Sequence, residues 1–139
     1  MKKLLAIILT MLLIVCAAGC SGVGGKTPDA EPVVHDGETI GEGSKTFAAQ
    51  IVNLDGSAIS FTVKTDKRIV GEALQDLGVL EGEEGPYGLY IKTVNGKTLD
   101  YEKDGAYWAF YVDDAYAVTG VDETDIVETS VYQLRAEKG

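Results

Sequence analysis

The stretch YWAFYV, residues 107–112, constrains the fold more than any other part of the sequence. In an extended strand, successive side chains point to opposite faces of the sheet. One face of this strand would carry Trp108, Phe110 and Val112, and the other would carry Tyr107, Ala109 and Tyr111. Both faces are therefore apolar or aromatic, so each needs a cover or remains an exposed aromatic patch.

The residue types indicate how these side chains divide between core and surface. Large apolar side chains are mostly buried, so we expect Trp108 and Phe110 in the core. Tyrosine tolerates partial exposure because its hydroxyl group can stay in water. Tyr107, Tyr111 and the nearby Tyr116 are therefore either structural filler or part of a contact surface, and the sequence favours neither.

The first twenty residues have the pattern of a bacterial lipoprotein signal. Lys2 and Lys3 precede an apolar run that is too short to span a bilayer of about 30 Å and that ends in AAGC. Cys20 then takes the place of the cysteine that is lipidated after cleavage, although an ordinary signal peptide with an incidental cysteine has a similar pattern. We expect an extracytoplasmic protein that a lipid on Cys20 anchors to the bacterial cell membrane.

The composition changes after this signal. Residues 21–44 contain six glycines, two prolines and no aromatic residue, which is typical of a flexible linker. His35, the only histidine, lies in this linker and is assigned no role. The predicted organisation is a signal peptide at residues 1–19, a lipidated cysteine and linker at 20–44, and one domain at 45–139.

The charge and the cysteine count exclude several classes of function. With 22 acidic and 12 basic residues, the chain carries a net charge of −10, so its surface repels nucleic acid and anionic headgroups. Cys16 leaves with the signal and Cys20 carries lipid, so no thiol remains for a disulfide, a zinc site or a nucleophile. Because the domain also lacks histidine, Ser–His–Asp and Cys–His catalysis are excluded, and we expect a non-enzymatic protein.

The first half of the domain contains a hairpin and a helix. Residues 47–63 form two apolar runs around Asp55-Gly56, a strong turn signal. Apolar residues at helical spacing follow: Ile69, Val70, Ala73, Leu74 and Leu77. Asp66 is placed to cap this helix at its start, and Gly78 is placed to end it.

Strands resume after an acidic loop at residues 81–88. Segments 89–94 and 97–101 flank Asn95-Gly96, which favours a type I′ turn. The aromatic strand and a last strand at 130–136 follow. The sequence therefore predicts an α+β fold, a β-grasp-like mixed sheet with one helix packed across one face. One helix covers only one face, so a loop such as 113–121 or a ligand must cover the second face of the aromatic strand.

The second half is also rich in acidic residues, which raises the question of a metal or a glycosidase site. The acids of this region are Asp113, Asp114, Asp122, Glu123 and Asp125. Their spacing does not match an EF-hand loop, and solvation of turns and strand edges explains them better than calcium binding. A glycosidase needs two carboxylates that frame a sugar-sized cleft, and so small a domain offers little room for one. No metal site is predicted.

Residues 85–134 resemble the C-terminal domain of transcobalamin and intrinsic factor and of their bacterial lipoprotein relatives. The matching residues, in order, are Gly85-Pro86-Tyr87, Val94-Asn95-Gly96-Lys97, Tyr107-Trp108 with Phe110, and Gly120-Val121-Asp122. The helical stretch VGEALQDLG fits as well, so the resemblance covers roughly residues 47–136. It implies a β-grasp-like fold, in agreement with the predicted strands.

In the animal carriers of this family, the small domain closes over one face of cobalamin, and the loop that corresponds to Asp113–Thr119 faces the ligand. The resemblance therefore implies a corrinoid as a candidate ligand here. Two features depart from the family: this chain has no counterpart of the carriers' large helical-barrel domain, and its loop is DDAYAVT where the carriers have a Pro-Leu pair.

These observations lead to a hypothesis of a small, non-catalytic ligand-binding module on a membrane-anchored lipoprotein, with cobalamin or another corrinoid as the candidate ligand. The predicted ligand-binding residues are Tyr107, Tyr111, Asp113, Asp114, Tyr116, Val118 and Thr119. The alternative is a cell-surface protein–protein interaction module without a small-molecule ligand, in which the aromatic patch or a sheet edge meets a larger partner.

Overall fold

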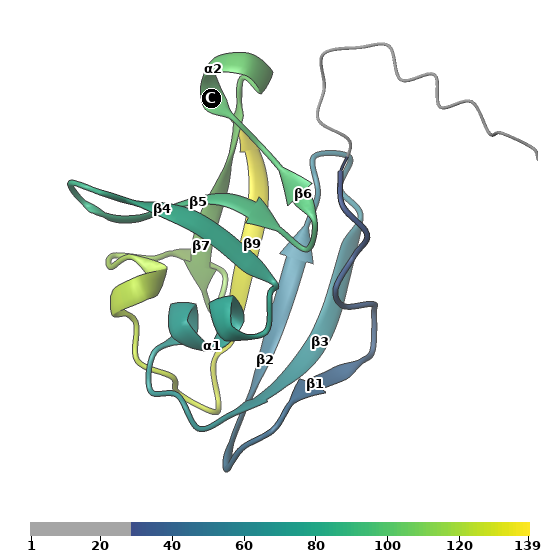
Figure 1. Ribbon diagram of the computed structural model, residues 1–139, viewed down its shortest axis with the longest axis vertical. Coiled ribbons are helices and arrows are strands. Elements are labelled where there is room, and N and C mark those ends of the chain that lie inside the picture. The colour runs from purple at the N-terminus through teal and green to yellow at the C-terminus, as the bar shows by residue number, and fades with distance from the viewer. Residues whose placement is uncertain (1–28) are drawn as a thin grey trace, which may run out of the picture.

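The computed structural model describes residues 29–139, and its main layer is a six-stranded mixed sheet (Figure 1). The described residues do not include the predicted signal peptide, or the part of the predicted linker from Cys20 to residue 28. The sheet consists of β1 (Thr39–Gly41), β3 (Ala58–Thr65), β2 (Lys45–Val52), β9 (Val131–Lys138), β7 (Ala106–Val112) and β8 (Ala115–Tyr116), in that spatial order. The central strands β2 and β9 are parallel, and each has an antiparallel neighbour on its other side, the strand order typical of a β-grasp sheet.

A second layer covers one face of this sheet. It consists of a three-stranded sheet, β4 (Leu80–Gly85), β5 (Gly88–Val94) and β6 (Lys97–Thr98), together with α1 (Val70–Asp76) and the 3-10 turn η1 (Val121–Glu123). In Figure 1 this small sheet crosses in front of the main one, with α1 beside it. The α+β class is therefore confirmed, but the prediction of a single sheet with one helix is wrong, because segments 89–94 and 97–98 belong to the cover.

The core lies between the two layers. From the main sheet, Phe47, Trp108, Phe110 and Tyr132 are buried, and from the cover Leu74, Leu80, Ile91 and Val94. The ring of Tyr132 meets Phe47 edge-on, with centroids 5.4 Å apart, and stacks with Phe110 at 6.2 Å. Its hydroxyl group donates to the Asp125 carbonyl oxygen and accepts from the Val127 amide, so the one polar atom of this aromatic cluster is satisfied.

Both predicted turns form as their residues require. In the β2–β3 connection Gly56 has φ 88°, a left-handed conformation that glycine adopts without strain. Asn95 and Gly96 have φ 49° and 84° between β5 and β6, the pattern of a type I′ turn. Asp113 and Asp114 repeat that pattern between β7 and β8, with φ 50° and 67°. They are therefore the two central residues of a tight hairpin.

Helix α1 forms at the predicted place but with a different start. The carboxylate of Asp66 accepts from the amide and hydroxyl of Ser44 and does not cap α1, whose N-cap residue is Ile69. The predicted stop is confirmed, since Gly78 has φ 76° directly after the helix. Gly71 lies against η1: a Cβ atom there would come within 2.8 Å of the Val121 carbonyl oxygen. This close approach explains a glycine inside a helix.

Two predictions for residues 81–101 are wrong. The acidic segment 81–88 is largely the strand β4, which pairs antiparallel with β5 through a turn at Pro86-Tyr87. The strand predicted at 97–101 ends at Thr98, and a second helix, α2 (Tyr101–Asp104), follows. Asp100 caps α2 by accepting from the amides of Glu102 and Lys103, which is why the chain leaves the extended conformation there.

The N-terminal described segment packs against the domain. Strand β1 pairs with β3, and Val34 is 1% exposed. The Asn95 side chain holds this segment by accepting from the amides of Val33 and Val34 and donating to the Val34 carbonyl. The folded region therefore begins before residue 45, earlier than the composition predicts. Between residues 29 and 139, no helix is both long enough and apolar enough to cross a membrane.

Candidate ligand-binding cleft

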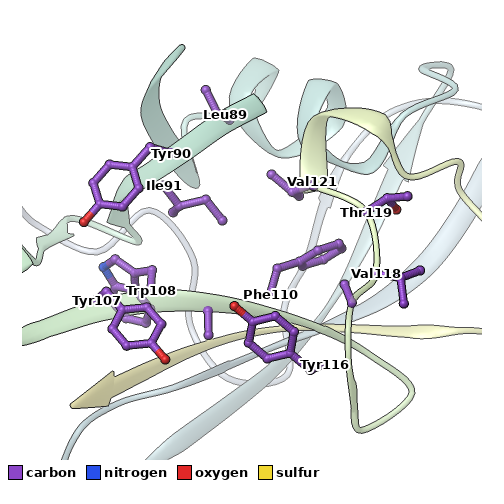
Figure 2. A pocket seen from close by; sticks show the side chains of 13 residues that line it. Leu89, Tyr90, Ile91, Tyr107, Trp108, Phe110, Tyr116, Val118, Thr119 and Val121 are labelled. Carbon is purple, nitrogen blue, oxygen red and sulfur yellow. The ribbon is translucent and has the colours of Figure 1, made fainter. Parts of the chain in front are cut away.

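An open cleft of about 300 Å³ lies between the edge of β7, strand β5 and the segment that follows β8 (Figure 2). Its lining residues are Leu89, Tyr90, Ile91, Tyr107, Trp108, Ala109, Phe110, Tyr116, Ala117, Val118, Thr119, Gly120 and Val121. Three separate stretches of chain thus converge on it. Eleven of these residues carry apolar or aromatic side chains, and the surface that the cleft exposes is about equally polar and apolar.

The cleft exists because β8 is very short. Only Ala115 and Tyr116 pair with β7, opposite Val112 and Tyr111, and the Ala117 amide then donates to the Phe110 carbonyl oxygen at 3.1 Å. After this bond the chain turns away towards η1. The edge of β7 at residues 106–109 is left without a neighbouring strand, and β5 crosses on the inner side to close the cleft from there.

Rigid core residues form the floor of the cleft. Trp108 and Phe110 are only 5% and 7% exposed, which confirms their predicted place in the core. The Trp108 indole N–H donates to the Lys97 carbonyl oxygen at 3.1 Å and so fixes the ring against the β5–β6 hairpin. Figure 2 shows Ile91 of β5 and Val121 of η1 around the same space. A ligand would meet a preformed apolar surface there.

Tyrosines and the 117–119 segment form the rim. Tyr90 and Tyr116 are exposed, Tyr107 is half-buried, and Val118 is almost fully exposed. Lys92 lies over the Tyr90 ring with its ammonium nitrogen 5.4 Å from the ring centroid. The Thr119 hydroxyl group is hydrogen-bonded to that of Thr124. The rim thus combines aromatic rings with hydroxyl groups that can donate to or accept from a ligand.

Tyr111 lies on the outer face of the main sheet and does not line the cleft. Its ring is 4.3 Å from the Arg135 guanidinium carbon and meets Tyr116 edge-on at 5.3 Å. Its hydroxyl group donates to the Glu137 carboxylate, as does that of Tyr107 at 3.1 Å. The hydrogen bond to Glu137 raises the pKa of Tyr111, whereas desolvation, with the same hydrogen bond second, raises the pKa of Tyr107.

The two aspartates predicted as ligand contacts also lie away from the cleft. Asp113 accepts from the Val131 amide at 2.8 Å, which ties the β7–β8 turn to β9. Asp114 forms an ion pair with Arg135 at 2.9 Å. The structure therefore divides the predicted set: Tyr107, Tyr116, Val118 and Thr119 line the cleft, and Tyr111, Asp113 and Asp114 belong to the outer face and its hairpin.

Sequence reasoning did not place β5 or η1 at the site. Leu89, Tyr90 and Ile91 are assigned to a strand by the sequence, but nothing local indicates that this strand crosses β7. Gly120 and Val121 appear as matches to the family resemblance and as the end of the loop 113–121 that is considered as a cover, but not among the predicted ligand-binding residues. Their position follows from packing, because Gly71 of α1 lets the backbone of Val121 approach closely.

Among residues 29–139, no three His, Cys, Asp or Glu side chains converge in a manner suited to a metal ion. One of the acids considered from the sequence, Asp125, forms an ion pair with Arg68 at 3.3 Å. The Nδ1 atom of His35 lies 3.5 Å from the Glu38 carboxylate on the N-terminal segment, where the His35 side chain is largely exposed.

Comparison with known proteins gives two kinds of match. The model of the family described as "Domain of unknown function (DUF4430)" matches residues 68–130, which include α1, the small sheet, β7 and the cleft-lining segment. A crystal structure from Ruminococcus gnavus ATCC 29149, described as a "putative metal binding protein", is 27% identical with a TM-score of 0.64. That match covers 69% of this chain and 99% of the other, so the two proteins share a fold over almost all of the R. gnavus chain.

A second solved structure is haptocorrin in complex with cobinamide, at 15% identity and a TM-score of 0.47. The match covers 68% of this chain and 25% of the haptocorrin chain. No curated protein sequence matches this chain.

Proposed function

We propose that this protein is a non-enzymatic, extracytoplasmic lipoprotein, anchored to the bacterial cell membrane through Cys20, whose folded domain binds a small ligand in the cleft beside β7. The observation that carries this proposal is the cleft itself. Buried apolar residues of packed strands form its floor, and polar groups make up about half of the surface that it exposes. Preformed concavities that combine apolar walls with placed polar groups are the usual form of a small-molecule site.

A corrinoid is the ligand class that we propose. The support is the resemblance to the transcobalamin and intrinsic factor C-terminal domain, which implies a β-grasp-like fold and a ligand near the segment after the Tyr-Trp strand. Two of the four matching stretches contribute to the cleft: Tyr107-Trp108 with Phe110, and Gly120-Val121. The segment 117–119, at the end of the loop implied by the resemblance, forms its rim.

The size of the cleft sets the expected affinity. Ligand pockets typically measure about 300–1,000 Å³, so this cleft of about 300 Å³ covers only part of a ligand as large as a corrinoid. Partial coverage leaves most apolar ligand surface in water. We therefore expect dissociation constants on the order of micromolar to millimolar for the domain by itself.

Calorimetric titration of the lipidated protein in detergent micelles with cyanocobalamin tests the proposal. Trp108 is the only tryptophan of the chain and lies in the cleft, so its fluorescence reports the same event. Because corrinoids absorb strongly, free N-acetyltryptophanamide under the same titration is the optical control. Saturable heat together with quenching beyond this control supports the proposal, and flat calorimetry up to millimolar ligand removes it.

Two matched tyrosine variants locate the binding. Tyr116→Ala removes a rim residue that is 62% exposed, whereas Tyr87→Ala removes a tyrosine that is 98% exposed on the β4–β5 turn and does not line the cleft. Both changes leave the core intact. We expect Tyr116→Ala to weaken binding about tenfold and Tyr87→Ala to leave it unchanged, since stacked aromatic contacts contribute about 0.5–1.5 kcal/mol beyond burial. Equal effects would place the ligand elsewhere.

A further inference from the structure

The backbone of β7 has a free edge beside the cleft. In an antiparallel ladder, the N–H and C=O groups of alternate residues point to opposite edges. The Ala117 amide donates to the Phe110 carbonyl oxygen, so even-numbered residues of β7 point towards β8. The Gly139 amide donates to the Gly105 carbonyl and the Asp113 amide to the Val131 carbonyl, so odd-numbered positions point towards β9.

This alternation leaves the backbone N–H and C=O of Trp108 without a neighbouring strand. Both groups point to the edge that β8 leaves uncovered, between α2 and Ala117. Within residues 29–139, no hydrogen bond joins either group to a backbone or side-chain partner on that side. Exposed strand edges are templates for an additional strand, and natural proteins usually block them. Here β8 pairs with residues 111–112, and no strand pairs with Trp108 on that side, although the neighbouring Ala106 and Ala109 are buried.

We propose that an extended peptide segment of a partner protein binds in the cleft as a short added strand, antiparallel to β7 and opposite Trp108. It would continue the line of β8 and pair with the N–H and C=O of Trp108. Strand addition of this kind draws affinity from main-chain hydrogen bonds and specificity from pockets for alternate side chains. This inference does not depend on a corrinoid ligand, although the two ligands would compete for the same cleft.

The floor of the cleft selects the peptide side chain. A residue directly opposite Trp108 would point to the same face as the Trp108 ring, towards the core side. It would lie against Leu89, Ile91 and Val121, so it should be apolar and of moderate size. Its neighbours in the peptide would point outward beside Tyr107 and can be polar. The expected motif is therefore an alternating strand in which the residue opposite Trp108 is apolar.

Charge decides between a partner peptide and a second copy of this chain. The chain carries a net charge of −10, so two copies repel each other at an edge-to-edge contact. The Glu137 carboxylate lies beside this edge, where it accepts the Tyr107 hydroxyl hydrogen. A peptide with lysines on both sides of the apolar centre complements this surface and gains in association rate.

Amide exchange measured by NMR tests the free edge directly. The probe is a seven-residue peptide, acetyl-Lys-Thr-Val-Thr-Val-Thr-Lys-amide, added to the lipidated protein in detergent micelles. Without peptide, we expect the Trp108 amide to exchange much faster than those of Ala109 and Tyr111, which point towards β9. At saturating peptide, Trp108 exchange should slow at least about tenfold, as for a newly paired strand residue. Protection of Trp108 in the free protein, or none with bound peptide, overturns the proposal.

A backbone-modified peptide separates strand pairing from simple apolar contact. The same sequence, N-methylated at the valines and thus without their N–H donors, keeps every side chain. We expect it to bind at least about tenfold more weakly, because the Trp108 carbonyl oxygen then loses its donor, and an unsatisfied group costs on the order of 1–3 kcal/mol. Equal binding of the two peptides would show an apolar pocket without strand addition and would overturn the proposal.

Two leucine variants and a titration with a corrinoid complete the test. Leu89→Ala alters the cleft floor, and Leu54→Ala alters an exposed leucine in the β2–β3 connection. Only the first should weaken peptide binding, and an equal effect of both would refute the assigned position. A parallel titration with cyanocobalamin distinguishes the two proposals. Heat of binding with the corrinoid and none with the peptide supports the proposed function and refutes strand addition. Heat of binding with the peptide and none with the corrinoid supports strand addition and refutes corrinoid binding.

Discussion

The two faces of β7 carry similar residues in opposite surroundings. On the inner face, Trp108 and Phe110 lie under a cover made of α1, η1 and the small sheet. On the outer face, Tyr107 and Tyr111 have no covering layer, and their rings lie among polar side chains of the same sheet. Ala109 between them is nevertheless buried, because its larger neighbours shield it.

The difference shows how one strand can carry aromatic residues on both faces although only one face has a covering layer. Phenylalanine and tryptophan need burial, whereas the tyrosine hydroxyl groups of the outer face can bond to Glu137. Arg135 lies over the Tyr111 ring and bonds to Asp114 and to Gln133. Gln133 in turn donates to Gln50 on β2. Polar side chains therefore cover the aromatic rings of the outer face, and the cleft lies at the edge of β7.

The largest expected effect is on the inner face. Phe110→Ala should destabilise the protein by about 3–5 kcal/mol, because it removes a ring that stacks with Tyr132 and leaves a cavity. The measurement is urea denaturation followed by far-ultraviolet circular dichroism. Tyr87→Ala, on an exposed turn, is the control and should stay within about 0.5 kcal/mol. A loss below about 1 kcal/mol for Phe110→Ala would mean that the cover is loosely packed.

The second prediction concerns how closely the cover is packed. In an open helix Gly71→Ala would gain about 1 kcal/mol from helix propensity. Here the new Cβ atom would lie 2.8 Å from the Val121 carbonyl oxygen, so we expect a net loss of about 1–3 kcal/mol instead. Gln75→Ala, at an exposed position of α1, is the control and should change the unfolding free energy by less than about 0.5 kcal/mol. Stabilisation by Gly71→Ala would contradict the α1–η1 contact.

The inner face could be predicted from the sequence better than the cover. Alternation, a local signal, predicts Trp108 and Phe110 in the core, whereas in the cover the sequence predicts the Asn95-Gly96 turn but not which layers meet. Strand β4 was missed: its glutamates resemble a solvated loop, and only pairing with β5 makes the segment extended. The position of β5 across β7 was missed for the same reason, since no local pattern specifies which layers meet.

Contacts between distant parts of the sequence explain the other errors. Val34 lies in a segment with linker composition, yet the Asn95 side chain holds it from 61 residues away. Asp66 has the residue type and spacing of a helix cap, but Ser44 offers two donors to its carboxylate. For the site, Tyr107, Tyr116, Val118 and Thr119 line one cleft, and their role in ligand binding stays a prediction. Asp113 and Asp114 are turn residues that the sequence alone does not separate from them.

A smaller effect is expected on the outer face. Tyr111→Phe removes only the hydroxyl group that donates to Glu137, at a half-buried position. We expect a loss of about 1 kcal/mol or less, because a hydrogen bond contributes about 0.5–1.5 kcal/mol and water can replace this one. The same urea denaturation measures it. A loss as large as that of Phe110→Ala would show that the outer face behaves as core, which would erase the contrast between the two faces.

The smallest effect is a dependence on pH. The pKa values of Tyr107 and Tyr111 lie above the ordinary 10.0 in the folded protein. Their contribution to stability is therefore fully present below about pH 10 and is lost as the pH rises through the folded-state values. Absorbance at 295 nm follows their ionisation. Glu137→Gln should move both pKa values down towards 10.0, because the carboxylate that disfavours the phenolate is gone, whereas Glu72→Gln on α1 should not. An unchanged titration in Glu137→Gln would mean that Glu137 does not organise the outer face, and that burial alone separates the two sides of β7.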